Sequence, residues 1–489
     1  MAEAWRGRLE RAAWLLLILA LPFTSLPLVA RLSGSMVAPA SGLVLPLLGL
    51  AWFVPYLLRG GRLGRQSLPL LAFIFAALIS GVAAFFMTIP TYRDISLARS
   101  ELKALITLAM GAGFYLVVAA WVVREDRLRF FLRWVNWTGL VVVGWSLVQA
   151  LVFRRMHTFP DWMQQIQALF VTTELYASRA NGFAFEPSWL AHQLNMLYLP
   201  WWLAASVRGT TVHRLKAGPL TLERGLLVGG VLTLVLSVSR IGLLGFLLMI
   251  AFLLLLGVLW LVGWLEGRLL ARSTLQGVRR ALARYGLRAG LLLGVLLVSL
   301  GMFLAAGFGL SRFDPRMADL FDLKALRTKS FTYYANQLVF AERIIFWEAG
   351  WQVFNQYPLL GVGPGNSGFY FMDRLSAFSW HLTEVRTLMY HLDVLPNIKS
   401  LWVRLLAETG LVGFACFAAF LAMHWYSADW LRRRRGLAST MGLAGLLVLV
   451  GLLTEGFSVD TFGLPYYWVS LGLVAGASLA LRPAEGEQH

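Results

Sequence analysis

Apolar runs long enough to cross a lipid bilayer fill most of this chain, and they constrain its fold more than any motif does. A helical span needs roughly 20 apolar residues. Backbone inside a bilayer must form helices or a closed barrel, because lipid cannot satisfy its hydrogen bonds. The runs are continuous rather than alternating, which favours helices. The sequence therefore predicts an all-α integral membrane protein with about 12 transmembrane helices.

One long polar segment, Leu310 to Lys399, interrupts the apolar runs. We expect residues 1–309 to hold membrane helices 1–9, residues 310–399 to form a large external loop or cap with helices of its own, and residues 400–489 to hold membrane helices 10–12. The predicted spans are residues 12–30, 40–58, 67–87, 104–123, 135–153, 189–207, 225–239, 241–264, 289–309, 400–425, 437–455 and 465–482.

Positive charge gathers in clusters between the apolar runs. The formal net charge is +18, which in a soluble protein suggests nucleic-acid binding. Here the clusters fall at every second connection, the pattern typical of cytoplasmic loops in a membrane protein. We therefore expect both termini in the cytoplasm, the long polar segment outside, and no nucleic-acid partner. The single cysteine, Cys416, excludes an intramolecular disulfide.

The first candidate site residues, Arg179 and Glu186, stand at the outer start of a predicted span. Pro187 suits the first turn of that helix. On one interpretation Glu186 and Ser188 are ordinary helix-start residues, because the positive end of the helix dipole favours them there. On the other, Arg179 and Glu186 face a water-filled external cavity.

A second candidate, Arg240, follows Ser239 between two apolar runs with almost no loop. An arginine confined between spans is costly unless it pairs, lines a wet site or extends to the lipid headgroups. Its planar fork of donors suits a phosphate. The position therefore predicts either a headgroup contact or a phosphate clamp.

The polar segment carries Glu342 and Arg343 on a predicted helix, before the glycine-rich stretch from Gly361 to Gly368. Such a stretch either forms a plain turn or offers backbone N–H groups to an anion. The segment ends at Lys399, at the entry to the next predicted span.

In that span Arg404 and Glu408 are four residues apart, which predicts an ion pair on one face of the helix. The small residues Gly410 and Gly413 predict close contact with another helix.

Histidines near the outer face, His192, His381 and His391, are acid–base candidates. Each of these histidines, taken alone, is more often structural or solvated. The sequence contains no metal-ligand spacing, no nucleotide-binding loop and no nucleophile elbow, so we expect no metal and no cofactor.

Taken in order, these elements resemble the O-antigen ligase/polymerase superfamily of bacterial envelopes. The resemblance covers about Arg179 to Gly413. The matching pieces are Arg179…Gly182…Glu186-Pro187-Ser188, Ser239-Arg240-x-Gly242, Arg343…Trp347…Leu360-Gly361-Val362-Gly363-Pro364-Gly365, and Leu405-Leu406-Ala407-Glu408-Thr409-Gly410-Leu411-Val412-Gly413.

The resemblance implies a metal-independent, GT-C-like glycosyltransferase in the bacterial inner membrane. It implies that the enzyme uses undecaprenyl-diphosphate-linked oligosaccharide at the periplasmic face, with a chain-length regulator and a flippase as candidate partners. One departure bears on the activity. Ligases of the family carry a His-Asn pair where this chain has Lys399-Ser400, and this favours a Wzy-type repeat-unit polymerase over a ligase.

The leaving lipid diphosphate develops negative charge, which fixed cations stabilise. We expect Arg179, Arg240 and Arg343 to supply them, with Glu408 in the same substrate site. The candidates for the base that deprotonates the acceptor hydroxyl are Glu186, His391 and Lys399. Glu186 is the first choice.

Two other functions stay open. The first is an O-antigen ligase that transfers polymer to lipid A-core or protein. The second, from a different class, is a flippase or other transporter of lipid-linked oligosaccharide. A transporter is expected to carry charges deep in several spans and paired repeats, whereas the polar residues here gather at one face.

Overall fold

The computed structural model describes residues 2–214, 216–218, 220–266, 268, 277–311, 341–391 and 394–481. The part of the predicted external loop at residues 312–340 lies outside the described residues. The chain divides into two compact units, one of Met1–Gly242 with Ala341–His489, and one of Leu243–Phe340. We call them unit 1 and unit 2.

The described residues are mostly helical, with one short antiparallel hairpin in which Lys216 pairs with Thr221. The elements are α1 (Ala2–Ala20), α2 (Pro27–Ser33), α3 (Ser41–Leu48), η1 (Gly49–Phe53), α4 (Val54–Leu58), η2 (Arg65–Ser67), α5 (Leu68–Ala84), α6 (Leu97–Trp121), α7 (Glu125–Met156), α8 (Asp161–Phe170), α9 (Pro187–Gln193), η3 (Leu194–Tyr198), α10 (Leu199–Arg208), β1 (Lys216–Ala217), β2 (Leu220–Thr221), α11 (Leu222–Ser237), α12 (Arg240–Leu265), α13 (Gly277–Ser311), α17 (Ala341–Gln356), η6 (Ser367–Tyr370), α18 (Phe371–Arg374), η7 (Ala377–His381), α19 (Thr383–Arg386), η8 (Thr387–His391), α20 (Leu401–Arg432), α21 (Gly436–Glu455) and α22 (Tyr466–Ala480).

Within the described residues, 8 helices are long and apolar enough to cross a membrane. They run over Ser41–Leu58, Arg65–Ala84, Leu97–Trp121, Glu125–Met156, Arg240–Leu265, Arg284–Gly309, Leu401–Arg432 and Gly436–Glu455. The chain is therefore an all-α, multi-pass membrane protein. The shorter apolar helix α22 occupies another predicted span, and the total of about 12 stays a prediction.

The predicted first span, residues 12–30, is wrong as one continuous helix. α1 ends at Ala20, and Pro27 begins the separate helix α2. Between them the backbone pairs with a later segment, because Leu26 N–H donates to the Ala38 carbonyl at 2.9 Å and Ala38 N–H donates to the Thr24 carbonyl at 3.1 Å. These hydrogen bonds replace those that a helix would make.

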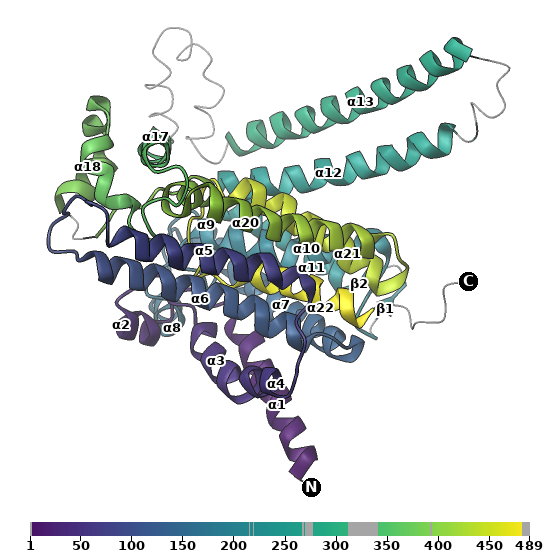
Figure 1. Ribbon diagram of the computed structural model, residues 1–489. Helices are drawn as coiled ribbons and strands as arrows, with labels where there is room; N and C mark the ends of the chain where they lie inside the picture. The colour runs from purple at the N-terminus through teal and green to yellow at the C-terminus, as the bar shows by residue number, and fades with distance from the viewer. Residues whose placement is uncertain are drawn as a thin grey trace. The chain divides into compact units, whose positions relative to one another are not determined.

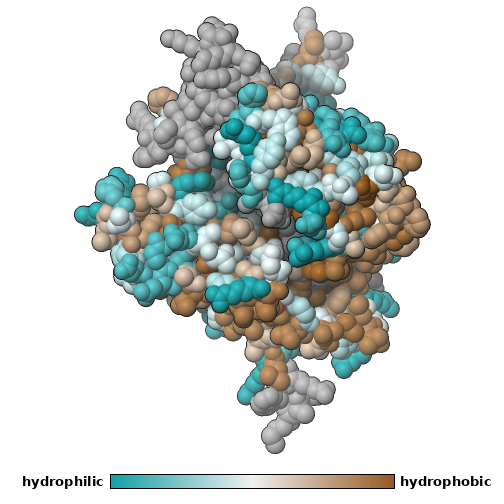
Figure 2. Space-filling view, turned by 90° about the vertical axis from the view of Figure 1, so that its left-hand side faces the viewer, coloured by the Kyte–Doolittle hydropathy of each residue, from teal (hydrophilic) through white to brown (hydrophobic). Residues whose placement is uncertain are grey.

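Unit 1 is a bundle in which α20 packs against α5 and α21, α22 packs against α6, and α10 packs against α11 and α21 (Figure 1). Its core contains wholly buried aromatic side chains, among them Trp14, Trp121, Trp202 and Trp468. Figure 2 looks at the end that carries α18 and the connection from α5 to α6, and shows hydrophilic side chains gathered on it beside hydrophobic ones. The bundle thus has a polar end.

Asn136 is the centre of one buried polar network in this core. The Asn136 side-chain oxygen accepts hydrogen bonds from the indole N–H groups of Trp201 at 3.0 Å and Trp202 at 2.9 Å, and its amide donates to Glu223 at 3.1 Å. Burial of an amide without such partners would cost about 2 kcal/mol or more.

In unit 2 the described helices are residues 243–265 of α12 and the helix α13. Arg288 donates to Glu266 at 2.7 Å. Over Arg284–Gly309, only 6% of the residues are buried. Apolar side chains that are exposed to this extent are expected where lipid is the solvent.

The helix α20 is broken at Gly410, whose backbone lies at φ 62° and ψ −167°. Glycine takes this conformation without the steric cost that other residues meet. The prediction that Gly410 contacts another helix is wrong, because its neighbours across the break are the backbone atoms of Leu359 and Leu360. An added Cβ would overlap the carbonyl oxygen of Leu359.

A helix break leaves backbone donors and acceptors without partners, and the glycine-rich stretch supplies them. Val362 N–H donates to the Ala407 carbonyl and Gly363 N–H to the Glu408 carbonyl, both at 3.0 Å. In return, Leu411 N–H donates to the Pro358 carbonyl at 2.8 Å and Val412 N–H to the Leu359 carbonyl at 3.2 Å. We call this pairing of residues 358–363 with residues 407–412 the loop–break pairing.

The side chain of Ser80 on α5 joins the same structure. Its hydroxyl donates to the Glu408 carbonyl at 2.7 Å and accepts from Gly363 N–H at 3.1 Å. The sequence left two interpretations of the glycine-rich stretch open, a plain turn or an anion site. The hydrogen bonds support a structural role for Val362 and Gly363.

We predict that Gly410→Ala destabilises the protein by about 2–3 kcal/mol, because alanine at this φ is strained and its Cβ meets the Leu359 carbonyl. Gly144→Ala is the matched control, since a Cβ there has nothing within 4 Å and alanine favours the helix α7. The measurement is the thermal unfolding midpoint in detergent. Equal midpoints for the two variants would contradict the prediction.

Candidate active site

Four charged residues meet at the polar end of unit 1. Glu186 directly precedes α9, Arg343 lies in the first turn of α17, Lys399 precedes α20, and Asp460 lies between α21 and α22. The charges of Glu186 and Asp460 act on both Arg343 and Lys399. The structure thus brings together three residues that the sequence analysis singled out, Glu186, Arg343 and Lys399, and adds Asp460. We call these four residues the charged cluster.

Asp460 fixes the backbone that carries Lys399. One carboxylate oxygen accepts from Lys399 N–H at 3.0 Å, and the other accepts from the Asn397 side-chain amide at 3.5 Å. Lys399 has a φ of 56°, which is uncommon for a residue other than glycine. The charge-assisted hydrogen bond that the Asp460 carboxylate accepts stabilises this conformation.

The ammonium group of Lys399 lies 5.0 Å from the centre of the Phe346 ring, and the Trp347 indole donates to the Lys399 carbonyl at 3.3 Å. Burial lowers the pKa of Lys399 to about 8, and the nearby Arg343 guanidinium adds to the lowering. Glu342, Asp460 and Glu186 oppose it. The amine therefore changes charge near neutral pH.

Arg343 donates to the carbonyl of Ser458 at 3.3 Å. Burial lowers the pKa of Arg343, and the carboxylates of Glu186, Asp460 and Glu342 counter that shift. An arginine stays protonated in proteins despite such shifts. A fixed positive charge is thus held beside the Glu186 carboxylate.

Glu186 accepts a hydrogen bond from the Ser188 hydroxyl and is half-buried before Pro187, the first residue of α9. Arg179 donates from Nε to the Ser237 carbonyl at 3.1 Å, at the end of α11. Burial raises the pKa of Tyr176, with Glu186 adding to the rise and Arg179 opposing it. Tyr176 therefore lies within electrostatic range of both Arg179 and Glu186.

Arg240 is half-buried at the first turn of α12, where the Ser239 hydroxyl accepts from Gly242 N–H at 3.4 Å. A Cβ on Gly242 would crowd Ala191 of α9, and Asn195 donates to the Gly242 carbonyl at 2.7 Å. The Ser239-Arg240-x-Gly242 element is therefore packed against the helix that begins directly after Glu186.

A buried polar group of His192, Asn195 and Glu455 holds this packing together. His192 Nδ1 lies 2.5 Å from one Glu455 oxygen, and Asn195 donates to the other at 2.6 Å. His192 and Glu455 are each 1% exposed. Removing one partner of such a buried pair is strongly destabilising, so the three residues bind α9 and η3 to α21.

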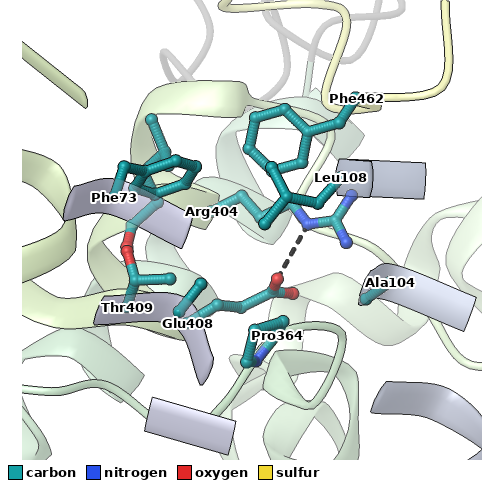
Figure 3. Close-up of a pocket in the computed structure, with 10 residues that line it drawn as sticks. Phe73, Ala104, Leu108, Pro364, Arg404, Glu408, Thr409 and Phe462 are labelled. Carbon is teal, nitrogen blue, oxygen red and sulfur yellow. Dashed lines mark hydrogen bonds and ion pairs between the residues drawn. The ribbon is translucent and has the colours of Figure 1, made fainter. Parts of the chain in front are cut away.

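Glu408 lies inside the helix bundle, and its carboxylate bonds to residues outside the charged cluster. Its carboxylate accepts from Arg404 Nε at 3.0 Å and from the Ser367 hydroxyl at 2.9 Å, which confirms the predicted pairing with Arg404. Figure 3 shows this ion pair among Phe73, Leu108, Pro364 and Phe462. Glu408 also lines a larger cavity, together with Arg404, so its predicted place in the substrate site stays a prediction.

His391 is exposed at the end of η8, next to residues outside the described part of the chain. Its role as a base likewise stays a prediction. Among the described residues, no group of three or more His, Cys, Asp or Glu side chains is placed to hold a metal ion.

Residues 225–418 match a family model described as O-antigen ligase. The match supports the similarity of the chain to the O-antigen ligase/polymerase superfamily. The matched stretch includes Arg240, Arg343, Lys399 and Glu408, while Arg179 and Glu186 precede it. No curated protein matches the chain.

We predict that labelling of Lys399 by a small amine-reactive acylating reagent is half-maximal near pH 8, because the neutral amine reacts and the pKa lies there. Arg343→Gln removes a neighbouring like charge and therefore moves the midpoint to higher pH. Arg154→Gln, at an exposed position on α7, is the control and leaves it unchanged. Mass spectrometry of the Lys399 peptide gives the pH midpoint of labelling. An unchanged midpoint in Arg343→Gln would refute this electrostatic coupling.

Proposed function

We propose that the chain transfers a glycan from undecaprenyl-diphosphate-linked oligosaccharide to a hydroxyl of a second lipid-linked unit, at the external face of the bacterial inner membrane. The observation that carries this proposal is the charged cluster, in which a half-buried carboxylate, Glu186, lies within electrostatic range of the cations Arg343 and Lys399. Glycan transfer needs a proton acceptor and a site for a departing diphosphate, and this arrangement offers both.

In the proposed reaction the acceptor hydroxyl oxygen attacks the anomeric carbon of the donor sugar. The bond from that carbon to the diphosphate oxygen breaks, and the diphosphate leaves with the electron pair. Glu186 takes the hydroxyl proton. Arg343 and protonated Lys399 stabilise the negative charge on the diphosphate, together with Arg179 and Arg240, because fixed cations in a water-poor site act strongly on developing charge.

Repeat-unit polymerisation is the leading form of this activity, because Lys399-Ser400 stands where ligases of the family carry a His-Asn pair. The description of the matched family favours the second candidate, an O-antigen ligase. The experiment uses purified protein in lipid nanodiscs with lipid-linked repeat unit and, separately, lipid A-core. A ladder of products on undecaprenyl diphosphate identifies a polymerase, and transfer of glycan to lipid A-core identifies a ligase.

For Arg240→Ala we predict at least a 100-fold loss of chain extension, roughly the loss seen when one donor to a developing oxyanion is removed. The variant is expected to remain in the membrane, because α12 keeps its apolar length. Arg31→Ala, at an exposed position on α2, serves as the control and retains activity. Ladders of normal length from Arg240→Ala would remove Arg240 from the mechanism.

For Glu186→Gln we expect turnover to fall by about 10²–10⁴-fold, because the amide cannot accept the acceptor's proton. Glu174→Gln tests the same change at an exposed carboxylate in the same connection and leaves turnover intact. Turnover is measured with purified lipid-linked repeat unit. A Glu186→Gln enzyme as fast as the Glu174→Gln enzyme would exclude Glu186 as the base.

A further inference from the structure

A cavity of about 360 Å³ opens in unit 1 between the start of α6 and the loop that leads into α20. Its lining includes the cations Arg99 and Lys103. The other lining residues are Ile95, Ser100, Ala104, Thr107, Gly365, Ser367, Val394, Leu395, Pro396, Asn397, Arg404, Glu408 and Thr461. We call this cavity the α6 cleft.

Arg99 and Lys103 give the α6 cleft its charge. They are four residues apart on α6, so they lie on the same face of the helix. Both side chains are exposed, and among the described residues neither makes an ion pair. The other charged residues of the lining, Arg404 and Glu408, neutralise each other at 3.0 Å. The cleft is therefore positive.

The remaining polar groups suit sugar hydroxyls. Thr107, Ser367, Asn397 and Thr461 present hydroxyl and amide groups, which both donate and accept hydrogen bonds. The wall is held in place by Ser100, whose hydroxyl donates to the Gly365 carbonyl at 2.7 Å. A Cβ on Gly365 would come within 2.9 Å of the Ala104 Cβ, so this glycine permits the loop to approach α6.

The α6 cleft adjoins the charged cluster through Asp460. Asn397 and Arg404 line the cleft, and they donate to the Asp460 carboxylate at 3.5 Å and to the Asp460 carbonyl at 2.6 Å, respectively. The same carboxylate accepts from Lys399 N–H at 3.0 Å. A molecule in the cleft is thus separated from Lys399 by one shared residue.

We propose that the α6 cleft binds the acceptor glycan, and that it selects a glycan with an anionic group, a sugar carboxylate or a sugar phosphate, which Arg99 and Lys103 hold. This inference rests on the proposed glycan transfer. The volume, the neutral hydroxyl and amide groups and the cations Arg99 and Lys103 match an acidic oligosaccharide. Asp460 connects the cleft that would hold such a glycan to Lys399 of the charged cluster.

Binding of two soluble probes tests the proposal on the full chain in nanodiscs of neutral lipid. The probes are a tetrasaccharide of galacturonic acid and maltotetraose, which has no charge. Calorimetry is expected to show tighter binding of the acidic probe. In Arg99→Ala/Lys103→Ala the acidic probe binds at least about tenfold more weakly, because two charge-assisted contacts are lost, while maltotetraose binding is unchanged.

Two further variants control for charge and folding. Arg154→Ala/Arg155→Ala removes two exposed arginines at the end of α7 that do not line the cleft, and it is expected to bind both probes normally. Arg99→Lys/Lys103→Arg keeps both charges and retains the preference for the acidic probe. Equal binding of the two probes by the unaltered protein would overturn the proposal.

A lipid headgroup is the competing anion. If the double alanine variant binds the acidic probe normally but retains less phosphatidylglycerol than the unaltered protein, Arg99 and Lys103 hold lipid and the proposal fails. Because binding is measured without turnover, the two proposals fail separately. A protein that binds the acidic probe through Arg99 and Lys103 but transfers no glycan would refute the proposed function and leave the cleft assignment standing.

Discussion

The loop–break pairing is the interaction on which the polar end of unit 1 depends. A helix that crosses a membrane normally satisfies its own backbone, and α20 gives up that arrangement at Gly410. The carbonyls of Ala407 and Glu408 are then satisfied by the loop at Val362 and Gly363. The break therefore couples α20, which follows Lys399, to the segment after α17, which carries Arg343. Both cations of the charged cluster are held by elements that this one exchange of hydrogen bonds joins.

Two buried acids inside the bundle, Glu408 and Glu455, have defined partners. Glu408 is bound by Arg404 and Ser367, and Glu455 is bound by Asn195 and pairs with His192. Such pairs cost desolvation and are weak evidence for stability, but they specify which helices lie together. The charged cluster differs, because Glu186, Arg343 and Lys399 are only half-buried. Partial exposure leaves these groups accessible to a charged substrate.

The parts of this arrangement that depend on local spacing along the sequence were predictable. The apolar runs predicted α6, α7 and α21, and the spacing of four residues predicted the Arg404–Glu408 pair. What failed depends on partners distant in the chain. The break after α1 follows from pairing with Ala38, and His192 meets Glu455 across 263 positions. A sequence shows which residues are polar and how far apart they are, but a contact of this length is decided by how the helices pack.

Asp460 shows how the two halves of the proposed chemistry are linked. Its carboxylate holds the backbone of Lys399 and contacts Asn397, while its carbonyl accepts from Arg404. One residue thus positions the cation that would stabilise the leaving diphosphate and two side chains that line the α6 cleft. Efficient transfer between two bound substrates requires their reacting atoms to be held in a fixed relation. Asp460, shared between the proposed donor and acceptor sites, would provide such a relation through hydrogen bonds.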